Sequence, residues 1–392
     1  MKISIIVGNL SSEGEGRWYG SRVFLLAEAL RASGYGVELL GYAPDDKRVD
    51  FSDLPYPVRV ERLCFFPGFF LSAYRLARRV SGDVVYALRP RPDTFGVALV
   101  LRWLRRTPVV LDVDDWELGW LGGESFTYRP SLKTFLRDLL KPNGRLRDPA
   151  FPSYLRFTEA RARRADGITV HTKFLNDRFG GAYVPNGKNL ELFDPKRYDP
   201  EASREKYGLA GYRILMFPGA PRKHKGAEDV LAALDLLGID DLRLVIVGGS
   251  PYDCYDRTLA ERWPQWLIQL PAQPYERMPE VVAAAHALVV PQHETPTALA
   301  QFPLKITDGM AMAKPILATT VGDIPKILGE TGFLVPPQSP EALARAIREI
   351  FDRWDTAIEK GRQGYERCRD AYSMERMAAS LRGVIEALPR CG

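Results

Sequence analysis

The chain has 392 residues, of which 46% are hydrophobic and 26% charged, a composition that excludes a disordered or collagen-like protein and favours two folded domains. Its four cysteines lie far apart and form no CxxC pair, so neither a disulfide framework nor a zinc cluster is indicated, and a reducing compartment is favoured. The formal charge is only +5, but residues 62–185 hold 21 basic and 12 acidic residues, which favours an anionic partner surface; an ordinary arginine-rich surface is the alternative.

The first half alternates short apolar runs with helical periodicity, the pattern of parallel α/β units. Residues 3–7 are predicted to form a strand rather than a signal peptide, because no charged-then-apolar order with a cleavage site is present. A glycine-rich loop follows, and then a helix over 23–32 with its apolar residues on one face. The further predicted elements are strands at 37–41, 58–63, 83–87, 108–113, 167–171 and 182–184, and a helix over 93–106.

The alternation restarts in the second half, after a connection over 185–211 that is rich in Pro, Asn and Asp. The predicted strands are 213–217, 242–247, 266–270, 287–290 and 315–319, and the predicted helices are 227–237, 304–313 and 340–352. No short repeat is visible, which argues against solenoids and propellers. The sequence therefore predicts an α/β protein with two Rossmann-like, doubly wound domains that face each other across a cleft.

The loop after the first strand carries glycines, among them Gly16 and Gly20, that would let a phosphate or sugar approach the backbone closely. We assign both glycines to donor binding. The loop lacks the GxGxxG spacing of dinucleotide sites, and the chain contains no GxxxxGK[ST], HExxH or GxSxG motif. The sequence thus argues against an NAD enzyme, a P-loop NTPase, a zinc protease and a serine hydrolase.

Five blocks of the second half resemble one known family. They are Val184–Gly187 (VPNG) with Phe193 and Pro195, Phe217–Gly219 through Lys225–Gly226, Asp308–Ala318 (DGMAMAKPILA), Thr331–Pro337 (TGFLVPP) and a closing helix within Asp370–Leu388. In this order they resemble glycosyltransferase family 4, the retaining group 1 type with the GT-B fold; the first half resembles it only loosely. The resemblance implies an acceptor-binding domain over 1–190, a donor-binding domain over 191–370, and a C-terminal helix, 371–392, that crosses back.

Breaking a sugar–nucleotide bond builds negative charge on a diphosphate, which fixed cations must stabilise. By resemblance Lys225 holds the position of the family's phosphate-binding lysine, and Gly219 begins the same loop. Ala220 stands where an arginine usually follows this glycine, so Arg222 is expected to supply the guanidinium. Lys305 is expected to face the phosphates. The alternative for the loop is an ordinary solvated basic segment.

Members of the family typically carry two glutamates separated by seven residues, and the second contacts the ribose. Asp308 stands at the second position and Ala300 at the first. Glu294, which follows a predicted strand, is the candidate replacement for the first acid, with an ordinary loop residue as the alternative. Replacing Lys225 or Asp308 by alanine is expected to remove most activity without unfolding the protein.

Three acids, Asp112, Asp114 and Asp115, lie at the carboxyl end of the predicted strand 108–113, the edge where ligands bind in open α/β sheets. We expect Asp114 or Asp115 to bind hydroxyls of the donor or acceptor; capping of the next turn is the alternative. The DxD pattern that Asp112 and Asp114 form belongs to another glycosyltransferase architecture. The resemblance therefore implies no bound metal and no other cofactor.

The resemblance implies a retaining hexosyltransferase that moves sugar from a nucleotide-sugar to a glycan, lipid-linked or other hydroxyl acceptor, in polysaccharide or glycolipid biosynthesis. One alternative is a sugar-nucleotide epimerase of the GT-B type. Another is a non-catalytic subunit that scaffolds a partner transferase. The sequence leaves the sugar, the base and the acceptor open.

Two segments bear on membrane binding. Residues 62–80 combine four phenylalanines with arginines, as interfacial binding to anionic lipid requires, and residues 129–164 are the second candidate. Packing of these aromatic residues into the core is the alternative. No stretch is long and apolar enough to span a bilayer. We expect a cytoplasmic protein, peripheral on the inner face of the membrane, and no nucleic-acid partner.

Overall fold

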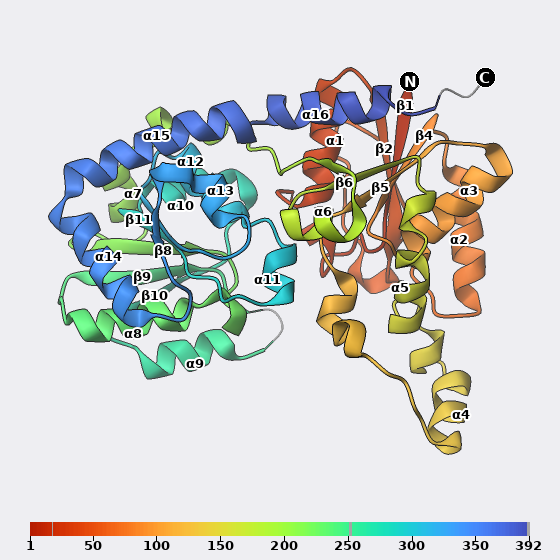
Figure 1. Cartoon of the computed structure of the whole chain (residues 1–392), viewed down its shortest axis with the longest axis horizontal. Coiled ribbons are helices and arrows are strands. Elements are labelled where there is room, and N and C mark those ends of the chain that lie inside the picture. Colours follow the sequence, from red (N-terminus) through yellow and green to blue (C-terminus); the bar gives the residue numbers. More distant parts are fainter. Residues whose placement is uncertain (18, 251–252, 390–392) are drawn as a thin grey trace. The chain divides into compact units, whose positions relative to one another are not determined.

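The computed structural model describes residues 1–17, 19–250 and 253–389 (Figure 1). It divides into two units, the first formed by Met1–Pro185 with the chain from Met377 onward, the second by Asn186–Arg376. The second unit thus begins five residues before the expected boundary and ends six residues after it. Backbone hydrogen bonds hold these flanks within it: Lys188 N donates to Tyr372 O (2.7 Å), and Met374 N donates to Lys188 O (3.1 Å).

A seven-stranded parallel sheet forms the first unit, in the order β3-β2-β1-β4-β5-β6-β7. The strands are β1 Lys2–Val7, β2 Gly36–Ala43, β3 Val58–Arg62, β4 Val84–Leu88, β5 Val109–Val113, β6 Gly167–Val170 and β7 Ala182–Tyr183. Every residue of β4 and β5 is buried, as expected for inner strands of a parallel sheet. The strand order reverses between β1 and β4, so the loops that follow these two strands flank a crevice where such sheets bind ligands.

The helices of this unit are α1 Arg22–Ala32, α2 Gly68–Arg79, α3 Val97–Arg105, α4 Leu132–Leu140, α5 Pro152–Glu159 and α6 Lys173–Phe179. The helix predicted over 93–106 is interrupted: a π-helical turn at Pro92–Gly96 precedes α3. Figure 1 shows α4 at the end of a long excursion between β5 and β6, away from the sheet of its unit. No described helix is both long and apolar enough to cross a membrane.

The second unit repeats the plan with six parallel strands in the order β10-β9-β8-β11-β12-β13. They are β8 Arg213–Pro218, β9 Leu242–Val247, β10 Leu267–Leu270, β11 Ala287–Val290, β12 Ile316–Thr319 and β13 Phe333–Val335. Counted within the unit the order is 3-2-1-4-5-6, that of a doubly wound domain. The predicted architecture of two Rossmann-like domains is confirmed.

Helices surround this second sheet: α7 Pro200–Lys206, α8 Ala227–Leu237, α9 Tyr255–Arg262, α10 Met278–Ala283, α11 Pro296–Ala300, α12 Leu304–Ala311, α13 Ile324–Leu328, α14 Pro340–Asp352 and α15 Trp354–Tyr372. The core lies between the sheet and α8 and α14, and includes Phe217, Leu234, Leu244 and Ile347, each 1% exposed or less. The closing helix expected within 370–388 corresponds to α16 Met374–Glu386, and the range also includes the last three residues of α15. Ser373 adopts an extended conformation that ends α15, and α16 Met374–Glu386 begins after it.

Candidate active site

Two glycines shape the loop between β8 and α8 in the second unit. Gly219 follows β8 with a φ of +112°, a conformation that is strained for any residue with a side chain. Gly226 ends the loop, and a Cβ atom there would lie 1.8 Å from the carbonyl oxygen of Pro291. The loop and the segment after β11 are therefore in direct contact, at the carboxyl edge where the strand order reverses.

Three cations gather at this edge. Arg222 and Lys225 belong to the loop, and the Lys225 Nζ donates to the carbonyl of Ala220 (3.2 Å). Lys305, in the first turn of α12, places its Nζ 3.3 Å from the centre of the Phe217 ring at the end of β8. Burial, and then the charge of Arg222, lower the pKa of Lys225 to about 8.

The lysines also act on each other. The pKa of Lys305 lies well below its ordinary value, first because of burial and then because of the charge of Lys225; the carboxylate of Asp308 opposes both. Cations that are partly buried and repel one another favour an incoming anion, which relieves both penalties. The sequence predicted Arg222, Lys225 and Lys305 separately, and the fold brings them together.

Asp308 is not a free carboxylate. Its Oδ1 pairs with the Nζ of Lys188, and both residues are buried, with exposed fractions of 5% and 2%. The ammonium of Lys188 also lies over the rings of Phe193 (4.3 Å) and Tyr275 (5.5 Å). Burial lowers its pKa most, but the charges of Asp308 and Tyr275 and the hydrogen bond to Asp308 together outweigh burial and raise the pKa of Lys188 above its ordinary value. The expectation that Asp308→Ala leaves stability intact is therefore revised, because this substitution would leave the buried ammonium of Lys188 without its ion-pair partner.

The segment after β11 is anchored to α8. The imidazole of His293 lies 2.8 Å from the carboxylate of Asp229, and its backbone N–H donates to the carbonyl of His224 (2.9 Å). Glu294, the next residue, is exposed. The structure thus holds Glu294 beside the loop that carries Lys225, and its role as the first acid stays a prediction.

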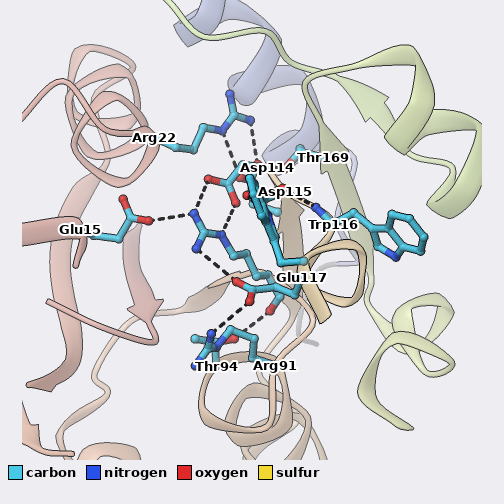
Figure 2. A network of polar contacts seen from close by, with 12 residues as sticks. Glu15, Arg22, Arg91, Thr94, Asp114, Asp115, Trp116, Glu117 and Thr169 are labelled. Carbon is cyan, nitrogen blue, oxygen red and sulfur yellow. Dashed lines mark hydrogen bonds and ion pairs between the residues drawn. The ribbon is translucent and has the colours of Figure 1, made fainter. Parts of the chain in front are cut away.

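A network of arginines and carboxylates occupies the corresponding edge of the first unit (Figure 2). Arg89 follows β4 with a φ of +64° and contacts Glu15, Asp114 and Glu117 at 2.7–3.2 Å. Arg91 pairs with Asp93 and Glu117. The left-handed backbone of Arg89 is unfavourable for a residue with a side chain, and three ion pairs to one guanidinium offset that cost.

Asp112 and Asp114 are both held by arginines. Arg22, from α1, donates two hydrogen bonds to Asp112 (2.8 and 3.0 Å) and one to the carbonyl of Val184 (2.8 Å). Burial opposes the ionisation of Asp114, but the guanidinium of Arg89 outweighs it and holds the pKa of Asp114 at about 2. Asp114 therefore has a structural ion pair, and its binding of a ligand hydroxyl stays a prediction.

Asp115 behaves differently from Asp114. Burial raises the pKa of Asp115 to about 6, against the attraction of Arg89. Its carboxylate accepts hydrogen bonds from its neighbour's backbone N–H (2.8 Å) and from the indole of Trp120 (3.0 Å). A carboxyl group that titrates near neutral pH at a sheet edge can accept or donate a hydrogen bond to a ligand hydroxyl.

The glycine loop of the first unit is closely packed. Gly16 and Gly20 are buried, and a Cβ at Gly16 would lie 2.7 Å from the carbonyl of Leu10. The loop forms a short 3₁₀ turn at Glu15–Arg17 and presents Glu15 to Arg89. Packing alone accounts for Gly16, and the donor-binding role of both glycines stays a prediction.

Sequence reasoning missed Lys188, Arg22 and Arg89. Arg89 could have been suspected, because Arg-Pro-Arg directly follows a buried strand at its carboxyl end. Lys188 stands 120 residues before its partner in an otherwise family-like block, and only the fold joins them. No group of three or more metal-ligating side chains is found among the described residues.

Two family profiles match the chain in succession. Residues 19–190 match the "Glycosyl transferase 4-like domain" and residues 212–353 match "Glycosyl transferases group 1". Among curated proteins, a D-inositol 3-phosphate glycosyltransferase of Corynebacterium glutamicum is 29% identical over 50% of this chain and 49% of its own. The D-rhamnosyltransferase WbpZ of Pseudomonas aeruginosa is 30% identical over 43% of each chain. The chain thus spans about half the length of these relatives.

Solved structures share the fold over nearly the whole chain. A sucrose-phosphate synthase from Thermosynechococcus elongatus has a TM-score of 0.73 at 21% identity and covers 98% of both chains. HepE of Anabaena, in complex with UDP, has a TM-score of 0.73 at 15% identity and covers 99% of this chain and 100% of its own. From the two profiles and this shared architecture, the chain belongs to the group 1, or family 4-type, glycosyltransferases.

Proposed function

We propose that this protein is a retaining glycosyltransferase that moves a hexose from a nucleotide-sugar to a glycan, lipid-linked or other hydroxyl acceptor. The observation that carries the proposal is the cluster of Arg222, Lys225 and Lys305 at the carboxyl edge of the second sheet. Related proteins support the class of donor: HepE was solved with UDP and with UDP-glucose, and one curated relative is named as GDP-mannose-dependent.

In the reaction, the bond between the anomeric carbon and the phosphate oxygen breaks, and the acceptor oxygen bonds to the same face of the sugar. The acceptor proton passes to the departing phosphate oxygen. Because the acceptor oxygen itself attacks the sugar, no protein nucleophile is required. Arg222, Lys225 and Lys305 stabilise the charge that develops on the diphosphate. Because these side chains supply the positive charge, we propose that transfer needs no bound metal or other cofactor; unchanged turnover in EDTA is the expected result.

Asp308 is proposed to hold the ribose. Lys188 takes one position on its carboxylate, and a carboxylate accepts several hydrogen bonds, so capacity for ribose hydroxyls remains. Glu294 is proposed to contact the sugar, and Asp114 or Asp115 is proposed to bind hydroxyls of the donor or the acceptor. Gly219 leaves open space where a side chain would stand, which suits close approach of a phosphate to the backbone.

Calorimetry and thermal shift with UDP-, GDP- and ADP-sugars test the proposal, since a ligand that binds only the folded state raises its stability. We expect one donor series to bind the wild type, and Lys225→Met to weaken that binding at least tenfold. Lys223→Met is the matched control, because Lys223 is exposed in the same loop. Binding of no nucleotide, or equal binding by both variants, would refute the assignment.

Product analysis separates the alternatives. A GT-B epimerase would isomerise or release the sugar without an acceptor, and a scaffolding subunit would bind without turnover. A lipid-linked acceptor would bring the enzyme to a membrane surface, and one curated relative is named for a phosphatidylinositol mannoside. We therefore propose a cytoplasmic enzyme, peripheral on the inner face of the membrane, with no nucleic-acid partner.

A further inference from the structure

Helix α4 is amphipathic, but its apolar side faces outward. Its apolar residues follow the spacing i, i+3, i+4, i+7 and i+8, which places them in one stripe. They are Leu132, Phe135, Leu136, Leu139 and Leu140, and all five are exposed, from 40% at Phe135 to 75% at Leu132. In a surface helix that packs on its own core, this stripe would be the buried one.

The inward side of α4 is polar. Asp138 is its one buried residue among those described; it accepts hydrogen bonds from the Tyr128 hydroxyl (2.9 Å) and the Arg137 guanidinium (2.9 and 3.0 Å). Gly144 closes the following turn so tightly that a Cβ would lie 2.1 Å from the carbonyl oxygen of Asp138. Polar contacts therefore fix the helix with its leucines outward.

Hydrogen bonds join the end of α4 to the segment around the start of α2. The backbone N–H of Phe66 donates to the carbonyl of Arg147 (2.7 Å), and the Arg147 guanidinium donates to the carbonyls of Phe66 (2.5 Å) and Leu140 (3.4 Å). Arg147 thus links the end of α4 to the start of α2, where Phe65 and Phe70 are also exposed. We call the five α4 residues with Phe65 and Phe70 the α4 face.

Exposed apolar side chains are distributed unequally between the units. Of the eighteen large hydrophobic residues exposed in the described chain, sixteen belong to the first unit and only Leu236 and Ile358 to the second. Scattered apolar residues are normal on a surface, but a contiguous group indicates an interaction site. The α4 face holds seven of the sixteen.

The positive charge around α4 favours an anionic membrane over a second copy of the chain as the partner. Residues 127–148 contain six basic side chains and two acidic ones, and the acidic Asp138 is buried. A second copy of the chain would bring the same positive charge against this one. An anionic bilayer instead neutralises the basic residues and accepts the leucines at its interface.

We propose that the α4 face inserts into the headgroup region of a bilayer that contains anionic phospholipid. The proposal specifies the surface and the lipid class of the membrane association given above, and it rests on the proposed function only for the lipid-linked acceptor. It places the carboxyl edge of the first sheet, from which the α4 excursion leaves, toward the membrane. A lipid-linked acceptor would then reach Asp115 without leaving the bilayer surface.

Vesicle co-sedimentation of the full chain tests the inference without any donor sugar. We expect the wild type to bind vesicles of phosphatidylcholine mixed with phosphatidylglycerol, whose anionic headgroups give the surface a negative potential, and to be released as salt rises. Binding to pure phosphatidylcholine should be at least tenfold weaker. Leu136→Ser/Leu140→Ser should lower the affinity for the anionic vesicles about tenfold or more.

Leu236→Ser/Ile358→Ser is the matched control, because it removes two exposed apolar residues from the second unit, and it should bind as the wild type does. Lys133→Gln/Lys141→Gln should weaken binding in low salt and flatten its salt dependence. Failure of the wild type to bind, or equal binding to both kinds of vesicle, would overturn the inference. So would dimerisation in sedimentation velocity that the Leu136→Ser/Leu140→Ser variant abolishes, since the face would then serve a second copy. Nucleotide binding is unaffected by any of these outcomes and reports on the transferase proposal separately.

Discussion

The ion pair between Lys188 and Asp308 gives the sharpest test of the second unit, because both charges are buried and come from distant parts of the chain. Replacing Lys188 by methionine keeps most of the side chain's volume and its contacts with Phe193 and Tyr275, but leaves the carboxylate unpaired. Removal of one partner from a buried pair costs about 3–5 kcal/mol, since the remaining charge has lost its compensation. In a domain of this size the unfolding midpoint should fall by roughly 6–20 °C.

The double variant Lys188→Met/Asp308→Leu removes both charges, and a well-packed apolar pair is often as stable as the buried ion pair it replaces. We therefore expect it to recover at least half of the loss, as measured by differential scanning calorimetry. Lys206→Met is the control: its pair with Glu280 is exposed, at 54% and 26%, and its loss should cost no more than about 1 kcal/mol.

The pH dependence gives a second measurement. Since Asp308 raises the pKa of Lys188 in the folded state, the pair's contribution is fully present below the unfolded-state pKa, about 10.4. It is lost as the pH rises through the higher folded-state value. If the free energy of unfolding of Lys188→Met lies within about 1 kcal/mol of the wild-type value, or if the double variant is no more stable than Lys188→Met, the two residues are not coupled and the reasoning fails.

Three further predictions concern other charged groups. Donor affinity should fall as the pH rises through about 8, where Lys225 loses its proton, and Lys225→Arg should remove that step in calorimetric titrations; a flat wild-type profile would contradict it. Arg89→Met should destabilise the first unit by about 3–5 kcal/mol. Arg102 is 45% exposed in its pair with Asp166, so Arg102→Met should cost about 1 kcal/mol or less. The folded-state pKa of Asp115 is raised to about 6, so the folded state binds the extra proton, and the contribution of Asp115 to stability should fall as the pH rises from about 4 to about 6. Asp115→Asn removes this contribution, so its advantage in stability over the wild type should grow across that pH range and reach about 2–3 kcal/mol at pH 7; parallel profiles of the two proteins would count against the shift.

The helices and strands were predictable because residues close to each boundary determine where the element begins or ends. The helix at 227–237, the strands at 242–247 and 287–290, and the helix at 340–352 have the predicted bounds. Gly238, with a left-handed φ, ends the first of these, and Ser339 caps the last. Such signals lie within a few residues of the boundary they set.

The partnerships were not predictable, because they depend on how distant segments meet. The five-block resemblance pointed to Lys225 and Asp308, and the profiles confirm the family. The residues near Asp308 in the sequence give no sign that its partner is Lys188. The α4 face shows a similar limit. The spacing of its leucines defines a stripe on a helix, but periodicity cannot tell which way the stripe faces. Contacts of Asp138 and Gly144 decide that.

The division of the chain has a practical consequence for protein engineering. The second unit is one continuous stretch, Asn186–Arg376, whereas the first is assembled from two stretches that the second unit separates. The returning stretch is bonded to the first: the Ser33 hydroxyl donates to the carbonyl of Ala378 (3.1 Å), and Leu388 packs beside Gly167. Cutting the gene after residue 376 would therefore truncate the N-terminal domain rather than trim a tail. A self-sufficient first domain calls for a linker that joins Pro185 directly to Met377.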